Sequence, residues 1–328
     1  MRNIIILTSF LVVMLIVAGC DGGEGTSGPS IGDVFIGGTS GLEISFLENA
    51  PPSEVTDKSA SGAGFPFQAV VAIENVGEYS VPSNLLNIKL SGFFPSDFLG
   101  SGSSGIEEPL GEEFKGVRKD PDGNKIQGDI RQITFPKTGK FEYQSELAGN
   151  QGFPFIAEAC YFYQTKAISQ ICLREKLTSG DSKVCEPFGS KPVSNHGAPV
   201  HVTSITQSIG GEDKMLLHFT VKKVGTSEIF SQSDCVSTFK SEDRVEVEVK
   251  TGLGDSDSQL PDCLGLLKDG SDKGNTGELL LINGEGSFTC VQTLDANSKV
   301  NSIKTMDIVL GYYAQDTVST DVVVKHLI

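Results

Sequence analysis

An internal repeat constrains the fold of this chain more than any other feature. Residues 67–79 align with residues 215–227, and residues 160–164 align with residues 311–315 at nearly the same offset. Two matches at one offset indicate that a single supersecondary arrangement is used twice. We therefore expect two copies of one domain.

Both copies carry strand signals, because short runs of Val, Ile, Thr and aromatic residues alternate with polar residues between Gly and Pro. The first copy opens with a strand over residues 42–47 and ends with a hairpin that joins residues 153–163 to 170–173. Seven short strands at such spacing are typical of an immunoglobulin-like sandwich. The predicted fold is all-β, with two tandem immunoglobulin-like β-sandwiches. The strands expected in the second copy are 200–206, 216–224, 245–250, 278–282, 287–292, 306–313 and 318–325.

The N-terminus predicts export and a lipid anchor. Arg2 precedes an apolar segment that is shorter than the roughly 17 residues a membrane-spanning helix needs, and Val17-Ala18-Gly19 leads into Cys20. This pattern resembles a lipoprotein signal, in which the thiol of Cys20 takes up the lipid and becomes the mature N-terminus. An ordinary secretory peptide with a chance cysteine and an uncleaved anchor are the alternatives.

These signals divide the chain into four expected parts. Residues 1–19 are a lipoprotein signal peptide, and residues 20–41 are a Gly- and Ser-rich tether. Residues 42–195 form the first sandwich, with a long insertion at 95–130, and residues 196–328 form the second. For the apolar island at Val34-Phe35-Ile36 within this tether, an extra edge strand and a strand donated to a neighbour are the alternatives.

The cysteines indicate disulfides. Setting Cys20 aside leaves an even number in an exported chain, with no spacing typical of zinc or redox sites. The expected hairpin brings Cys160 opposite Cys172. For the remaining residues we expect Cys263 with Cys290, which leaves Cys185 with Cys235. The disulfide cysteines are then Cys160, Cys172, Cys185, Cys235, Cys263 and Cys290.

Residues 95–130 have little periodicity and many Gly, Ser and acidic residues. A structureless insertion of this length is usually functional or disordered. Its centre, Asp120–Asn124, resembles a calcium loop only weakly, because Lys125 and Arg131 stand where such a loop has glycine and a bidentate glutamate. A plain Asp-Gly turn fits better. The acidic stretch 96–129 is the expected contact surface.

Charge and motifs exclude several functions. The formal net charge is −16 without any basic run, so nucleic acid is not an expected partner. Of the four histidines, His196 and His201 lie near each other in the sequence, while His218 and His326 are distant, and no third zinc ligand is apparent. No nucleophile elbow, phosphate loop or zinc-protease motif occurs. We expect no catalytic residue, metal or cofactor.

Aromatic residues near the ends of both copies are candidate binding groups. Tyr161 and the pair Tyr312-Tyr313 lie on expected strands. Because side chains alternate across a strand, at least one of each pair belongs to the core.

The segments Ile73–Gly77 and Val221–Gly225 carry a resemblance to a known family. They are similar to CARDB-type and related immunoglobulin-like modules of archaeal and bacterial surface proteins. The lipoprotein signal ending at Cys20, the tether and the Gly311-Tyr312-Tyr313 strand also resemble exported lipoproteins of small-genome archaea. The resemblance implies adhesive, scaffold or envelope roles and no catalytic residues.

The expected function is that of a lipid-anchored structural or adhesive protein on the outer face of the plasma membrane. It would act by contact with envelope proteins, other surface proteins or glycans, and nothing in the sequence favours an oligomer or filament. The alternative is a solute-binding lipoprotein that delivers a ligand to a transporter or enzyme.

Overall fold

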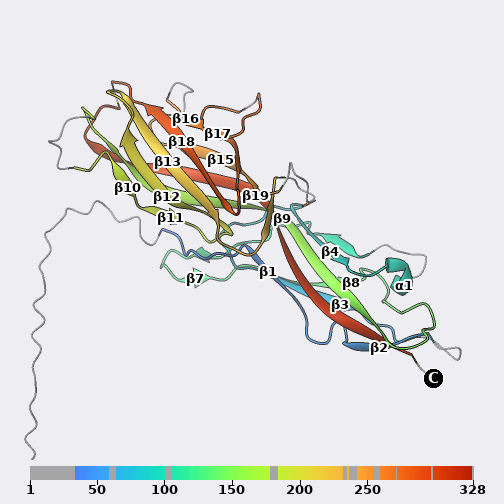
Figure 1. Ribbon diagram of the computed structural model, residues 1–328. Helices are drawn as coiled ribbons and strands as arrows, with labels where there is room; N and C mark the ends of the chain where they lie inside the picture. The colour runs from blue at the N-terminus through green and yellow to red at the C-terminus, as the bar shows by residue number, and fades with distance from the viewer. Residues whose placement is uncertain are drawn as a thin grey trace, which may run out of the picture. The chain divides into compact units, whose positions relative to one another are not determined.

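The computed structural model describes residues 34–58, 64–99, 105–177, 184–231, 235, 242–254, 259–270, 272–296 and 298–326. These residues belong to one compact unit that consists almost entirely of antiparallel strands, with one short helix in the described part (Figure 1). The all-β, sandwich-type prediction is confirmed. Within these ranges, no helix has the length and apolarity that crossing a membrane would require.

The described strands form four sheets. The three-stranded sheet has the order β1 (Leu42–Phe46), β3 (Ala69–Asn75), β8 (Ile130–Phe135). The five-stranded sheet has the order β10 (Gly189–Lys191), β12 (Val200–Ile209), β13 (Lys214–Lys223), β18 (Glu285–Thr293), β16 (Asp262–Leu264). A two-stranded ribbon consists of β6 (Arg118–Lys119) and β7 (Lys125–Ile126).

The largest sheet connects both halves of the chain. Its path is β17 (Thr276–Leu280), β15 (Arg244–Lys250), β19 (Ser302–Lys325), β9 (Gln151–Leu173), β4 (Leu86–Ser91), β5 (Glu107–Pro109). Three short strands pair off this path: β11 (Val193–Asn195) with β9, and β14 (Glu228–Phe230) and β2 (Glu54–Thr56) with β19. At the centre, β9 and β19 pair antiparallel along the whole length of β9.

The strand order shows the internal repeat. The order β1-β3-β8 corresponds to β12-β13-β18, and β9-β4-β5 corresponds to β19-β15-β17, with antiparallel pairing throughout. The path β17-β15-β19-β9-β4-β5 therefore reads the same from both ends when each strand is replaced by its counterpart. A local two-fold arrangement relates the copies, with Tyr163 of β9 paired to Tyr312 of β19.

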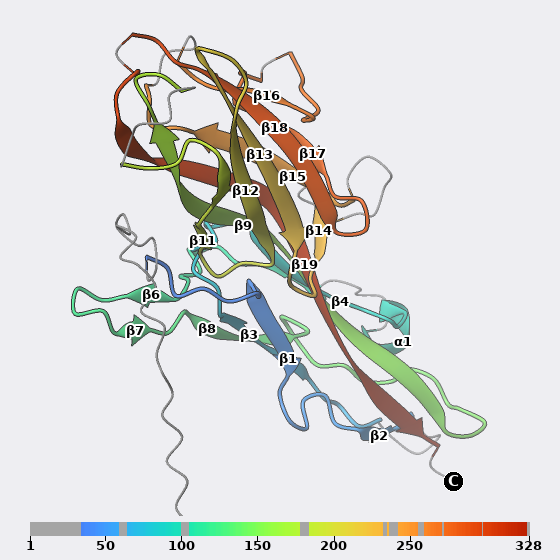
Figure 2. The same cartoon turned by 60° about the vertical axis from the view of Figure 1, so that its left-hand side comes forward.

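Each long strand contributes to two sandwich lobes (Figure 2). The first lobe contains β1, β3 and β8, packed on β4, the N-terminal half of β9 and the C-terminal half of β19. The second contains β12, β13 and β18, packed on β15, the N-terminal half of β19 and the C-terminal half of β9. The expected boundary between residues 195 and 196 thus lies inside one unit.

The expected hairpin at residues 153–173 is wrong. Side chains alternate between buried and more exposed along a single strand from Phe153 to Ile171. The presumed turn at residues 165–169 contains no Gly, Pro, Asn or Asp, and Ser169 is its only residue of a type that is common in turns. The two expected strands at 306–313 and 318–325 are likewise one strand, β19.

The repeated Val-Gly pair makes the same contact in both copies. The amides of Val76 and Gly77 both donate to the carbonyl of Gly41, at 3.1 and 3.0 Å. The amides of Val224 and Gly225 both donate to the carbonyl of Pro199, at 2.8 and 3.0 Å. Both copies therefore use the same pair of backbone hydrogen bonds to join the end of one strand to the start of its neighbour.

The expected tether is ordered at its C-terminal end. The carboxylate of Glu78 accepts hydrogen bonds from the amides of Ile36, Gly37 and Gly197, at 2.7 to 2.9 Å. The Val34-Phe35-Ile36 island is neither an edge strand nor a donated strand, because these contacts hold it against its own chain. Residues 1–33, with the predicted signal peptide and Cys20, lie outside the described residues.

The insertion at 95–130 is not structureless in its described part. It contains α1 (Pro95–Leu99), β5, β6 and β7, and it places Phe98 and Phe114 in the core with no exposed surface. Phe98 packs edge-on against Phe155 of β9, with ring centroids 5.4 Å apart. The insertion therefore completes the core of the first lobe, because its two phenylalanines bury apolar area there. The weak periodicity of the segment did not predict this burial.

Candidate functional site

An acidic row crosses the outer face of the nine-stranded sheet in the second lobe. The register places Glu278 of β17 beside Glu246 of β15, Glu246 beside Gly311 of β19, and Gly311 beside Gln164 of β9. Side chains at paired positions share a face, so one row joins four strands. Glu248 adds another carboxylate on the same face of β15, two residues along the strand.

This row forms the floor of a groove of about 690 Å³, which we call the acidic groove. One wall is the segment 267–269 with Asp272, and Phe162 of β9 lies at the opposite end. Gly311 has no side chain to project into the groove. A Cβ there would lie 3.5 Å from the Phe162 ring and 3.6 Å from Glu246 Oε2. A large side chain at residue 311 would occupy part of the groove.

The groove carries negative charge that its own basic residues do not neutralise. Arg244 pairs with Glu278 at 2.7 Å, Lys250 pairs with Glu248 at 2.9 Å, and Lys268 lies 3.1 Å from Asp262. Glu246 has no basic partner among the described residues. Partial burial, followed by the carboxylates of Glu278 and Asp272, raises the pKa of Glu246. A bound cation would relieve this repulsion, so the site favours cationic groups.

Aromatic side chains flank the groove. The rings of Phe162 and Tyr313 are in edge contact with centroids 5.4 Å apart, and Tyr79 contacts Phe162 at 6.0 Å. All three side chains are partly exposed. Aromatic faces beside carboxylates are suited to cationic and amphipathic ligands.

Of the aromatic residues expected from the sequence, only Tyr313 reaches this surface. Tyr312 and Tyr161 are buried in the core. The Tyr161 hydroxyl donates to Asp316 at 2.6 Å and accepts from the amide of Leu42 at 3.1 Å, while Ser227 donates to the same carboxylate at 2.8 Å. Burial raises the pKa of Asp316. Tyr161 and Tyr312 are structural residues, as the alternation along a strand predicts.

The six expected disulfide cysteines all form bridges, but two of the three expected pairings are wrong. The structure pairs Cys160 with Cys235 and confirms Cys263 with Cys290. Cys160 and Cys172 cannot bond because both lie on β9 twelve residues apart, which is about 40 Å of extended strand. The Cys160–Cys235 bridge joins the first half of the chain to the second and fixes them covalently.

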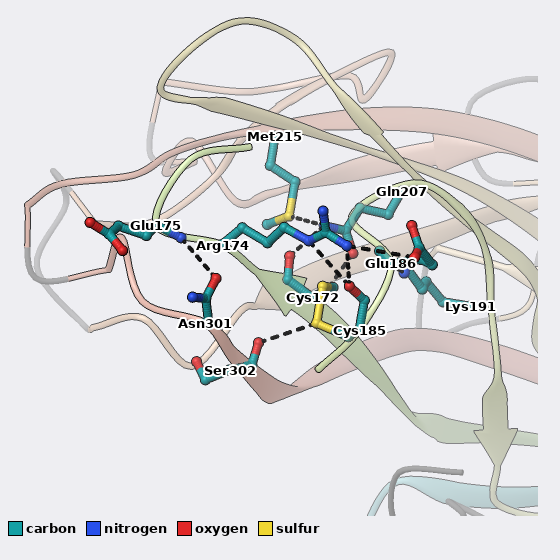
Figure 3. Close-up of a disulfide and its surroundings, with 10 residues drawn as sticks. All are labelled: Cys172, Arg174, Glu175, Cys185, Glu186, Lys191, Gln207, Met215, Asn301 and Ser302. Atoms are coloured by element: carbon teal, nitrogen blue, oxygen red, sulfur yellow. Dashed lines mark hydrogen bonds and ion pairs between the residues drawn. A yellow bond between two sulfur atoms is a disulfide. The ribbon is translucent and has the colours of Figure 1, made fainter. Parts of the chain in front are cut away.

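The third bridge, Cys172–Cys185, anchors the segment after β9 (Figure 3). Gln207 of β12 accepts from the amide of Cys172 at 2.9 Å and donates to its carbonyl at 2.7 Å. The guanidinium of Arg174 donates to the carbonyl of Cys185 at 2.7 and 3.2 Å and pairs with Glu186 at 3.6 Å. These contacts hold the segment against the edge of β9.

The histidines do not form a metal site in the part of the chain that the structure describes, where no cluster of potential ligands occurs. The ring of His196 accepts from the amide of Lys166 at 3.0 Å, and burial lowers the pKa of both His196 and His201. His218 contacts Thr289, and His326 pairs with the carboxylate of Asp57. All four are structural or surface residues.

Asp120–Asn124 forms the expected Asp-Gly turn between β6 and β7. The Asp120 carboxylate accepts from the amides of Asp122 and Asn124, at 3.0 and 2.8 Å, and Gly123 has a φ of +85°. The other carboxylate oxygen of Asp120 accepts from the side-chain amide of Asn124 at 3.0 Å. The described part of the expected contact stretch 96–129 lies in the first lobe, away from the groove residues.

The groove was missed because its members come from distant segments. The alternation of Val and Glu in Arg244–Lys250 was a usable signal, since it predicts a strand with one acidic face. Nothing in the sequence shows that Glu278, Gly311 and Phe162 lie on the neighbouring strands.

No protein-family model matches this chain, and a search of curated proteins finds no significant match. The resemblance to CARDB-type modules and to archaeal surface lipoproteins therefore stays a prediction.

Proposed function

We propose that this chain is a lipid-anchored protein of the cell surface that acts by contact, and that the acidic groove is its contact site. The observation that carries the proposal is the groove itself. Its carboxylates outnumber the basic residues that reach it, and partly exposed aromatic rings stand beside it. Such a surface attracts a positively charged partner and steers its approach.

The three disulfides support an exported location. Disulfides persist in oxidising compartments and are rare in the cytosol. Cys20 supplies the lipid attachment in this proposal. The intact mass of the protein from its own membrane fraction tests it: a chain that begins at Cys20 and is heavier by lipid supports the anchor, whereas a chain that retains Met1 contradicts it.

The partner fits the groove through basic groups presented on an envelope protein or an amino-bearing glycan. A lysine, arginine or amino-sugar cation can lie between Glu246 and Glu278 while its carbon skeleton covers the Phe162 and Tyr313 rings. Because the carboxylates are largely at the surface, the interaction should weaken as salt rises. This behaviour distinguishes it from a purely apolar contact.

Affinity capture from envelope extracts, together with a glycan array, tests this site. The protein is compared with the double variant Glu246→Gln, Glu248→Gln and with the control Glu285→Gln, whose carboxylate pairs with Lys222 outside the groove. We expect the double variant to lose the captured partner or glycan and the control to keep it. Equal capture by all three proteins would contradict the assignment of the groove.

A solute-binding lipoprotein is the second candidate. The groove volume of about 690 Å³ falls within the range of small-molecule sites. This function predicts that a small organic cation raises the melting temperature of the protein and that Glu246→Gln abolishes the shift. No shift across a set of polyamines and cationic amino acids would favour macromolecular contact.

A further inference from the structure

The internal repeat gives each lobe an equivalent side, and a separate segment of the chain covers this side in the second lobe. In the second lobe this side lies between β12 and the C-terminal half of β9, and the segment 184–195 covers it. Within that segment, β10 pairs with β12 and β11 pairs with β9. The Cys172–Cys185 bridge ties the segment in place (Figure 3).

The equivalent side of the first lobe lies between β1 and the C-terminal half of β19. There β14 pairs with β19 through residues 313–315, and β2 pairs with it through residues 323–325. On this edge of β19, which faces away from β9, no described strand pairs between these two, and none pairs with the outer edge of β1. Residues 316–322 of β19 pair with β9 on one edge only, and their other edge spans about 23 Å of extended chain.

The outer edge of β1 presents free backbone groups. Along an edge strand, backbone amides point alternately toward the neighbouring strand and away from it. The amide of Leu47 donates to Val70 of β3, so it points toward β3, whereas the amide of Leu42 points away and donates to the Tyr161 hydroxyl. The amides of Ile44 and Phe46 therefore point to the outer edge. An exposed edge of this kind can pair with another chain.

The core-facing side chains on this side are incompletely covered. Ile44, Phe46 and Val318 pack against the core but stay partly exposed. In the second lobe, by contrast, Val202 of β12 and Ile171 of β9 have no exposed surface. The difference follows from the covering segment, which the first lobe lacks in its described part.

The open side is acidic. A cavity of about 340 Å³ lies on this side, lined by Glu43 and Asp316 together with Ser40, Thr226, Ser227 and Thr317. Asp321 is exposed farther along β19, and Lys325 is paired with Glu54 at 2.6 Å. An occupant with basic residues would complement these charges, and one with apolar residues would cover Ile44 and Phe46.

We propose that the outer edge of β1 accepts an extended strand of a partner protein, in the way that β12 accepts β10. The partner strand pairs its backbone with Ile44 and Phe46, places apolar side chains toward the core, and places basic side chains toward Glu43 and the solvent. This is strand addition, in which main-chain bonds give affinity and alternate side chains give specificity.

The test uses a capped heptapeptide of alternating valine and lysine, measured by fluorescence anisotropy at low salt on the full-length protein. There are three comparison peptides. One carries glutamate in place of lysine, and the other two carry N-methyl groups on one or the other set of alternate amides. The protein variants are Ile44→Pro and Phe46→Pro, with Ile44→Val as the matched control. Proline is tolerated on an edge strand where its missing N–H faces outward, so the fold should persist.

We expect the valine-lysine peptide to bind and to slow hydrogen exchange at Ile44 and Phe46. Either proline variant, the glutamate peptide and one of the two N-methylated peptides should each bind at least about tenfold more weakly, a difference of 1.4 kcal/mol. Ile44→Val should bind as the unaltered protein does.

Three results would overturn the proposal. One is no binding of the valine-lysine peptide to the unaltered protein. Another is unchanged affinity in both proline variants while their melting temperatures are retained. The third is binding that Glu246→Gln abolishes and Ile44→Pro does not, which would place the peptide in the acidic groove and support the groove independently of β1.

Discussion

Replacing Gly77 by alanine is expected to destabilise the protein strongly, because a Cβ has no room at this position. It would lie 2.0 Å from the hydroxyl of Tyr163 and 2.7 Å from the carbonyl oxygens of both Gly197 and Ser40. The two carbonyls belong to the backbone and cannot rotate away. The ring of Tyr163 is fully buried, so it cannot swing out to solvent.

The magnitude follows from two costs. Overpacking a core by one methyl group costs about 1 to 3 kcal/mol. A displaced Tyr163 hydroxyl also loses its bonds to the Tyr79 amide and to Asn75, both at 3.3 Å, and an unsatisfied buried group costs about 1 to 3 kcal/mol. We expect a loss of about 3 to 5 kcal/mol in the free energy of unfolding, or roughly 6 to 20 °C in melting temperature.

Thermal unfolding followed by circular dichroism, with urea titration as a second measure, provides the assay. Gly149→Ala is the matched control, since a Cβ there meets no atom within 4 Å. Gly225→Ala probes the repeat, because its Cβ would lie 2.4 Å from the carbonyl of Thr39. A melting temperature for Gly77→Ala within about 2 °C of the Gly149→Ala value would refute the reasoning.

Three other perturbations separate the covalent and electrostatic contributions. Replacing Cys160 and Cys235 together by alanine should cost about 4.5 kcal/mol, because the bridge closes a loop with a sequence separation of 75; a urea midpoint that does not move would contradict this. Between pH 7 and 5 the free energy of unfolding should fall less in His196→Gln than in the unaltered protein. The pKa of buried His196 is lowered in the folded state, so the unfolded state binds more protons over this range and acidification favours unfolding. The pKa of Asp316 is raised, so the stability of the unaltered protein relative to Asp316→Asn should increase as pH falls from 7 to 4; an opposite trend in paired urea titrations would show that the carboxylate is not desolvated.

Local patterns were sufficient to predict much of the fold. The alternation of apolar and polar residues identified most strands, because a half-buried strand has a period of two residues whatever its neighbours are. The repeat was visible because Val76-Gly77 and Val224-Gly225 serve the same close approach of backbone segments. The Asp120–Asn124 turn was also predictable, since its hydrogen bonds are all local.

Long-range pairing decided what those patterns left open. A hairpin and a continuous strand have the same alternation, so alternation does not distinguish them. The pairing with β19 shows that residues 151–173 run straight through two lobes. The expected hairpin also led to the wrong Cys160–Cys172 pairing. A straight β9 separates these two cysteines, which pair instead with Cys235 and Cys185.

By itself the sequence determined a disulfide-containing, all-β chain built from two copies of one motif, because composition and periodicity record burial and local geometry. Export stays a prediction. The tertiary structure alone decided that the copies share β9 and β19. It also decided that Glu246, Glu278 and Gly311 form one row and that no described strand pairs with the outer edge of β1. Each of these depends on the lateral register between strands far apart in sequence, which no single segment encodes.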